Sequence, residues 1–199
     1  MRRRSKALVA LLIAIALGIT AGGVTYAAFV ATGTNSGNRI ESGSVKIGDN
    51  DGGSAMFSLT GMLPGSTDSG CIKVTYDGSL TSSVRLHGAT TGSGLDRYID
   101  LKVTRGVNSP SDPAFDGCGN FQADGTDYIN KGNGVVYDGT LRNFPDDYAN
   151  GLVDPTLGSP ESWTVNESHS YRFQVTLQSD VGAEGKNATQ VFTWEARNE

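Results

Sequence analysis

The stretch that decides the fold is Tyr171-Arg172-Phe173-Gln174-Val175-Thr176-Leu177, in which apolar and polar side chains alternate residue by residue. Successive side chains of a β-strand point to opposite faces, so this alternation predicts an antiparallel strand with one face in a core and the other in water. The segment Val191-Phe192-Thr193-Trp194-Glu195-Ala196 has the same pattern, with its even-numbered residues predicted inward. Two such strands near the end of the chain predict a sheet protein.

Shorter alternating segments separated by glycine-rich turns precede these two strands. We predict strands within residues 40–47, 56–60, 72–76, 84–87, 99–103, 135–141 and 163–165. Leu63-Pro64-Gly65 predicts a type II turn, because proline lacks the amide donor and glycine accepts a positive φ. Residues 106–135 lack apolar periodicity, and residues 143–152 have room for one helical turn. About eight strands without a sustained helical period predict an all-β fold, a two-sheet sandwich of the jelly-roll kind.

The beginning of the chain has the organisation of a signal peptide. A basic start, Arg2-Arg3-Arg4-Ser5-Lys6, is followed by the apolar run Ala7–Leu17 and then by small residues up to Ala27. Thr25 and Ala27 fit the small-x-small pattern of a signal peptidase site, so we predict cleavage between Ala27 and Ala28. The alternative is an uncleaved signal anchor, which the glycines after Leu17 disfavour.

This boundary divides the chain into three parts. We predict a signal peptide over residues 1–27, a flexible N-terminal arm over residues 28–38 and a β-sandwich domain over residues 39–199. The arm is small, polar and glycine-containing, so it buries little surface. The sequence has 16 basic and 21 acidic residues, and four basic ones lie in the signal peptide, which leaves 12 against 21, a net charge of −9. An acidic surface repels phosphate backbones, so we expect no nucleic-acid partner.

The sequence contains two cysteines, Cys71 and Cys118. In an oxidising compartment an even pair predicts one disulfide, and the alternative is two free thiols. Zinc would need more ligands than these cysteines and the separate His87 and His169 readily provide. We therefore predict surface positions for both histidines, and no Gly-x-Ser-x-Gly elbow marks a nucleophile.

Two groups of aspartates are candidate calcium ligands. Asp49-Asn50-Asp51-Gly52 has the start of an EF-hand loop, but the twelfth position is Thr60 instead of an acid, so an EF-hand is excluded. The irregular middle of the chain offers a second group. Its members are Asp112, Asp116, Asp124 and Asp127. Asp serves turns without any metal, so solvated turns are favoured over a calcium site, and we predict no cofactor.

Several segments, taken in order, resemble the TasA/camelysin family of secreted bacterial proteins. The signal-peptide end Gly22–Phe29 is similar to that of the family, and Glu41–Ile47 resembles its "SGTLDL" strand. Leu59–Ser66 resembles its "LxNLKPGD" strand and turn, and Tyr76–Leu80 its "NNGSL" turn. The last two strands, 171–177 and 190–196, match as well, whereas residues 91–160 match poorly.

The resemblance implies a jelly-roll subunit of biofilm-matrix or cell-surface fibres, secreted through a dedicated signal peptidase of the endoplasmic-reticulum type. It also implies assembly by donor-strand addition, in which the mature N-terminal arm pairs with the next subunit. The candidate donor residues are Ala28, Phe29, Val30, Ala31 and Thr32. The expected partners are further copies, joined head to tail, and other matrix proteins. A camelysin-like metalloprotease and a monomeric surface-binding module are the alternatives to this non-enzymatic function.

Overall fold

The computed structural model describes residues 30–34, 47–107, 113–156, 159–160 and 162–198. The longer strands are β1 (Val30–Thr34), β3 (Thr67–Tyr76), β4 (Ser82–Gly92), β5 (Ile99–Arg105), β6 (Val135–Thr140), β11 (Glu167–Leu177) and β12 (Ala188–Asn198). The shorter ones are β2 (Ile47–Asp49), β7 (Leu152–Val153), β8 (Pro155–Thr156), β9 (Ser159–Pro160) and β10 (Ser162–Trp163). Three short 3-10 helices complete the elements: η1 (Leu95–Arg97), η2 (Leu141–Asn143) and η3 (Val181–Ala183).

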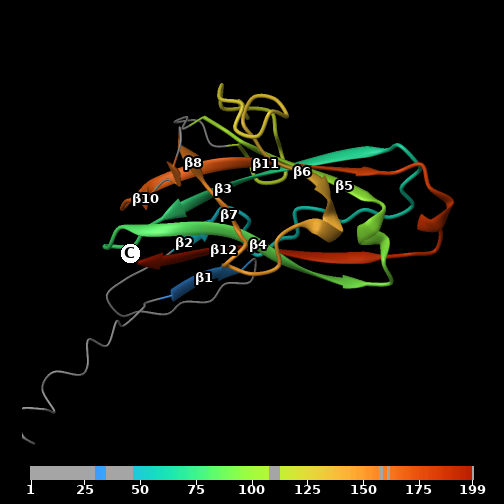
Figure 1. Cartoon of the computed structure of the whole chain (residues 1–199), viewed down its shortest axis with the longest axis horizontal. Coiled ribbons are helices and arrows are strands. Elements are labelled where there is room, and N and C mark those ends of the chain that lie inside the picture. Colours follow the sequence, from blue (N-terminus) through green and yellow to red (C-terminus); the bar gives the residue numbers. More distant parts are fainter. Residues whose placement is uncertain (1–29, 35–46, 108–112, 157–158, 161, 199) are drawn as a thin grey trace, which may run out of the picture.

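Two antiparallel sheets pack against each other (Figure 1). One sheet has the order β1-β12-β4-β10, with β7 also on β4, and the other has the order β2-β3-β11-β5-β6. Consecutive strands lie in different sheets at β1 and β2, at β3 and β4, at β4 and β5, at β6 and β7, at β10 and β11, and at β11 and β12. This alternation between sheets is the connectivity of a jelly roll, so the predicted all-β sandwich is confirmed.

The strand β11 is the centre of its sheet, because it pairs with β3 along one edge and with β5 along the other. Its odd-numbered residues, from His169 to Leu177, are buried, while the residues between them are only partly buried. In the facing sheet Trp194 and Ala196 point inward, and the ring centroids of Trp194 and Phe173 lie 6.0 Å apart across the core. The alternating pattern therefore predicted both central strands and the buried face of β11. In β12 the outward prediction is wrong for Thr193 and Glu195, which are buried as well as Trp194 and Ala196.

Other predicted elements differ from the structure. Residues 56–60 are not a strand: Phe57 packs against the core, and Met56 lies over Gly70, where an added Cβ would fall 2.4 Å from Met56 Cγ. The packing does not follow the alternation, because the adjacent Met56 and Phe57 both pack against the core while Leu59 is exposed. The expected helical turn within 143–152 is replaced by η2, which ends before Pro145. The turn at Pro64-Gly65 is confirmed, with a φ of 80° at Gly65.

Asp49 ends β2 and Asp51 follows it in the next turn, where Asp51 is almost fully buried and its amide donates to the Asp49 carboxylate. Burial, and next the neighbouring Asp51 carboxyl, raise the pKa of Asp49 to about 6. Because this value exceeds the unfolded one, the associated stability is complete below about pH 4 and is lost as the pH rises through 6.

Asp49→Asn should therefore raise the free energy of unfolding at pH 7 by about 1 kcal/mol, a value reduced for solvent screening at this half-buried site. Asparagine retains an oxygen that can accept the hydrogen bond from the Asp51 amide. Urea titrations at pH 4 and pH 7 would measure the effect, which should vanish at pH 4. The exposed Asp68→Asn is the matched control. A gain of equal size at both pH values would contradict the assignment.

Candidate functional site

The candidate assembly site is the edge formed by β1 and β12. The predicted cleavage residues Ala27 and Ala28, and the donor residue Phe29, lie outside the described residues. Val30, Ala31 and Thr32 begin β1. This strand pairs antiparallel with β12, from Val30 opposite Arg197 to Thr34 opposite Thr193.

The expectation of a flexible N-terminal arm over residues 28–38 is therefore wrong for residues 30–34. These residues form the edge strand of the sheet that contains β12 and β4. The physical reason is tertiary: β12 offers a row of backbone donors and acceptors that a strand can pair with. The β-branched residues at positions 30, 32 and 34 also favour an extended conformation. The prediction of a flexible arm relied on the small and polar composition of the segment and so missed this strand.

The Cys71–Cys118 disulfide is confirmed, with an S–S distance of 2.20 Å and a Cα–Cα distance of 5.3 Å. Cys71 lies on β3, and Cys118 lies in the irregular segment between β5 and β6. The Asp116 amide donates to the Cys71 carbonyl at 3.1 Å beside the bond. The disulfide therefore holds this irregular segment against the sheet that contains β3, β11 and β5, on the face turned away from the core. A disulfide is also compatible with an extracellular location.

The prediction of surface histidines is wrong. His169 is only 1% exposed, and the side chain of His87 is 14% exposed and lies 3.1 Å from Glu195. Because β11 alternates, His169 has the inward parity of Tyr171 and Phe173, and its ring packs at 4.4 Å from that of Trp163. The separation of the two histidines in the sequence did not determine their exposure.

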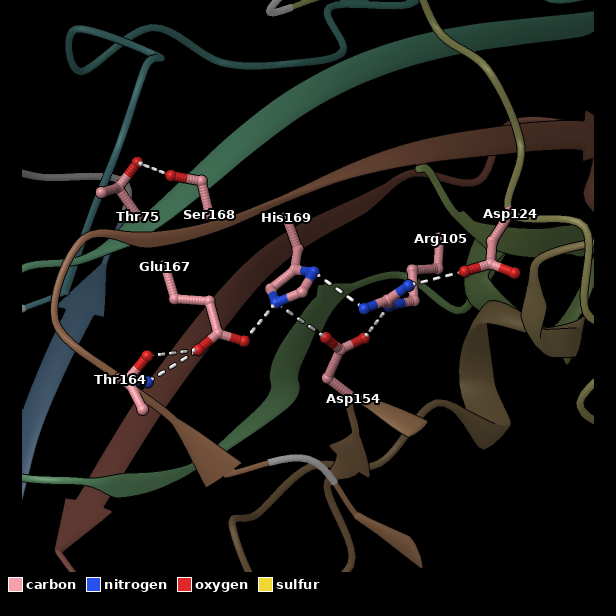
Figure 2. A network of polar contacts seen from close by, with 8 residues as sticks. All are labelled: Thr75, Arg105, Asp124, Asp154, Thr164, Glu167, Ser168 and His169. Atoms are coloured by element: carbon pink, nitrogen blue, oxygen red, sulfur yellow. Dashed lines mark hydrogen bonds and ion pairs between the residues drawn. The ribbon is translucent and has the colours of Figure 1, made fainter. Parts of the chain in front are cut away.

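His169 belongs to a buried charged cluster centred on Arg105, the last residue of β5 (Figure 2). The Arg105 guanidinium donates from Nε to Asp154 at 2.6 Å and from Nη1 to Asp124 at 2.7 Å. Its Nη2 atom lies 2.9 Å from His169 Nδ1. One arginine thus connects β5 and β11 with the segment after β7, which carries Asp154, and with the irregular segment, which carries Asp124.

The arginine also determines which ring nitrogen of His169 carries the proton. A guanidinium can only donate, so Nδ1 must accept and the ring proton must lie on Nε2. That nitrogen donates to Glu167 Oε1 at 2.9 Å and lies 3.4 Å from Asp154 Oδ2. Glu167 in turn accepts hydrogen bonds from the amide and hydroxyl of Thr164 at 2.8 and 3.0 Å. The chain of contacts therefore continues into the turn that follows β10 (Figure 2).

The pKa values of the charged groups follow from these contacts. Burial by itself lowers the pKa of Arg105, but the charge and hydrogen bond of Asp154 outweigh it and raise the pKa. Burial raises the pKa of Glu167, whereas hydrogen bonds from Thr164 and His169 outweigh that effect and leave the pKa lowered. The pKa of Asp124 is lowered in the same way, because hydrogen bonds from Thr126 and the Arg105 charge outweigh burial.

Arg105, His169 and Asp154 are each more than nine-tenths buried, so their side chains are poorly accessible to a ligand. The arrangement suits a structural cluster that joins chain segments. Asp154 also lines a small crevice with Leu86, Tyr171 and Trp194. The sequence held one signal of this cluster. Arg105 shares the odd-numbered parity of the buried Leu101 and Val103, as His169 does in β11.

Two of the four candidate calcium ligands in the irregular segment have other partners. Asp124 binds Arg105, and Asp127 accepts the Lys131 amide at 2.9 Å. Asp116 is exposed, and Asp112 lies outside the described residues. In the part of the chain that the structure describes, no group of three or more His, Cys, Asp or Glu side chains is arranged to hold a metal ion. Within the same residues, no helix is long and apolar enough to cross a membrane.

Of the motifs that resemble the TasA/camelysin family, Gly22–Phe29 and all of Glu41–Ile47 except Ile47 lie outside the described residues, and Leu59–Ser66 has the turn but no strand. Tyr76–Leu80 forms the turn between β3 and β4, and residues 171–177 and 190–196 lie within β11 and β12. No protein-family model and no curated protein sequence matches the chain.

Proposed function

We propose that the chain is a secreted, non-enzymatic structural subunit that assembles head to tail into extracellular-matrix or cell-surface fibres by exchange of its N-terminal strand. The observation that carries the proposal is the position of β1, which comes first in the described chain and lies at the edge of its sheet, on β12. A strand at an edge can leave without breaking the pairing of β12 with β4.

Exchange of this strand between copies conserves its interactions. The β1 strand of one copy can pair with the β12 of the next in the register seen within the chain, from Val30 opposite Arg197 to Thr34 opposite Thr193. The hydrogen bonds lost in one copy are then remade in its neighbour, as in domain swapping. When each copy donates to the next, the contact does not close, and the product is a filament.

The predicted signal peptide and the disulfide support secretion, because disulfides persist in oxidising compartments. Cleavage before Ala28 would place the donor strand next to the new N-terminus. The proposed partners are further copies of the chain, other matrix proteins and, during export, a signal peptidase.

A covalent lock on β1 tests the proposal without removing any part of the fold. The Gly88 amide donates to the Pro145 carbonyl at 2.9 Å, so Gly88 and its partner Phe192 turn their backbone groups away from each other. Backbone direction alternates along β12, so Trp194 and Ala196 point their backbone groups toward β1, and Arg197 and Val30 form a non-hydrogen-bonded pair. Such pairs have Cα atoms about 4.5 Å apart, which suits a disulfide. Mature protein carrying Val30→Cys and Arg197→Cys, once oxidised, should form no filaments in negative-stain micrographs.

The single variant Arg197→Cys, with its thiol blocked, is the matched control and should assemble like the unmodified protein. Circular dichroism should give the same spectrum for the locked and control proteins. Filaments that form from the locked protein would refute strand exchange. Unmodified mature protein that stays monomeric at every concentration would refute the fibre function itself.

A further inference from the structure

Two carboxylates meet in the turn that follows β2. Asp49 ends this strand, and Asp51 lies two residues later. Each aspartate uses its Oδ1 atom to accept an amide two residues further along: the Asp51 amide donates to Asp49 at 3.2 Å, and the Gly53 amide donates to Asp51 at 2.6 Å. The two carboxyl groups are also within hydrogen-bonding reach of each other. The turn therefore brings two acidic groups together, with both Oδ2 atoms left over from these amide contacts.

The Oδ2 atom of Asp51 is the feature that points to a ligand. Asp51 is only 7% exposed, and this oxygen is buried with no hydrogen-bond partner among the described residues. Within the same residues, no ion pair joins Asp49 or Asp51 to a lysine or an arginine. Burying a carboxylate oxygen without a donor or a cation is strongly unfavourable. A positive partner would therefore stabilise this turn.

The turn is fixed on the protein side and open on the other. Asn50 donates from its amide to the Lys73 carbonyl at 3.2 Å, and its Oδ1 accepts the Lys73 amide at 2.9 Å. Its Nδ2 donates to the Pro113 carbonyl at 3.1 Å. Gly52 and Gly53 close the turn at φ values of 60° and 83°, and a Cβ built on either would have no described atom within 4 Å. An ion can therefore approach from the glycine side while Asn50 keeps the turn in place.

The ligand chemistry of this turn favours calcium. Carboxylates, backbone carbonyls and water are the ligands that Ca²⁺ prefers, whereas Zn²⁺ prefers nitrogen and sulfur and Mg²⁺ demands a stricter octahedral geometry. A calcium–oxygen distance of about 2.4 Å is shorter than the distance of about 2.8 Å between a water and a carboxylate oxygen. The ion can therefore reach a buried oxygen that a water molecule cannot contact.

We propose that Asp49 and Asp51 hold a calcium ion, with carbonyl oxygens and water completing its ligand shell. The proposal differs from the expectation of no cofactor, and the EF-hand stays excluded because Thr60 occupies the twelfth position. Two acidic side chains give a weak site, with an expected dissociation constant of about 0.1–1 mM, as in extracellular calcium modules. The bound ion would stabilise the turn that joins β2 to β3 through Asn50. The proposal does not depend on the fibre function.

Thermal unfolding of mature protein near neutral pH, followed by circular dichroism, tests the site. Replacing a chelator with about 5 mM calcium chloride should raise the melting temperature by about 3–5 °C. Asp51→Asn should abolish this shift, because it removes the buried charge with little change in shape. The exposed Asp68→Asn is the matched control and should keep the whole shift. No shift in the unsubstituted protein, or an equal shift in Asp51→Asn, would overturn the site.

Asp49→Asn keeps the test decisive if Asp51→Asn does not fold. In the presence of chelator this variant should be more stable than the unsubstituted protein, because it loses the charge beside Asp51. Adding calcium should not raise its melting temperature further. Calcium titrations followed by amide resonances should move Gly52 and Gly53 in the unsubstituted protein and leave them unmoved in Asp49→Asn. Equal shifts with magnesium chloride, or resonance changes that spare both glycines, would overturn the proposal.

Discussion

Replacement of Arg105 by methionine is expected to lower the free energy of unfolding by about 3–5 kcal/mol, the usual effect of removing one partner from a buried ion pair. The guanidinium lies 2.6 Å from Asp154 and 2.7 Å from Asp124, and the Asp154 side chain is only 2% exposed. Methionine would leave Asp154 as a buried charge without its cation. It would also leave His169 Nδ1 without the donor at 2.9 Å.

Urea unfolding followed by tryptophan fluorescence would measure this loss, because Trp163 packs on His169 within the cluster. Arg142→Met is the matched control: Arg142 is 53% exposed and lies 3.4 Å from Asp96, so its loss should cost below about 1 kcal/mol. Adding Asp154→Leu to Arg105→Met should recover part of the stability, since the unpaired carboxylate is then gone. If Arg105→Met cost no more than Arg142→Met, the cluster would not stabilise the fold.

The sequence predicted the central strands because their signal is local. In β11 and β12 the side chains alternate over several residues, and the buried face of β11 follows directly from that period. In β12 the period identified Trp194 and Ala196, but Thr193 and Glu195 are buried too. The same period placed Arg105 and His169 on the inward face, although their polarity pointed to solvent. Asp154 gave no comparable signal, because it lies between the two-residue strands β7 and β8 and reaches Arg105 only through the tertiary fold.

The candidate assembly site was predicted in part. The composition of residues 28–38 identified a segment with little to bury, and the family resemblance supplied the donor-strand hypothesis. Neither could show that Val30–Thr34 pairs within its own chain, because the partner strand lies more than 150 residues later in the sequence.

The disulfide has the second large expected effect. Cys71 and Cys118 are 47 residues apart, and closing a loop of that length stabilises a fold by about 4 kcal/mol in the chain-entropy model. The double variant Cys71→Ala, Cys118→Ala should lose about that much in urea titrations. The reference is the unsubstituted protein with its disulfide intact, measured under the same conditions. A loss of free energy of unfolding below about 1 kcal/mol would show that other native contacts already fix the segment that carries Cys118.

The disulfide and the Arg105 cluster hold the same irregular segment, one at Cys118 and the other at Asp124, so their contributions to the free energy of unfolding should not add. Once the disulfide is removed, Asp124 is less well positioned, and Arg105→Met should lower the free energy of unfolding by less than it does in the unmodified protein. Groups coupled in this way usually show interaction energies of about 0.5–3 kcal/mol.

Filament formation by strand exchange should not depend on the disulfide. Cys71 lies on β3, in the sheet that does not contain β12, so the cysteine-free protein should still form filaments wherever it is folded. Loss of filaments from folded, cysteine-free protein would mean that assembly depends on this segment as well as on β1.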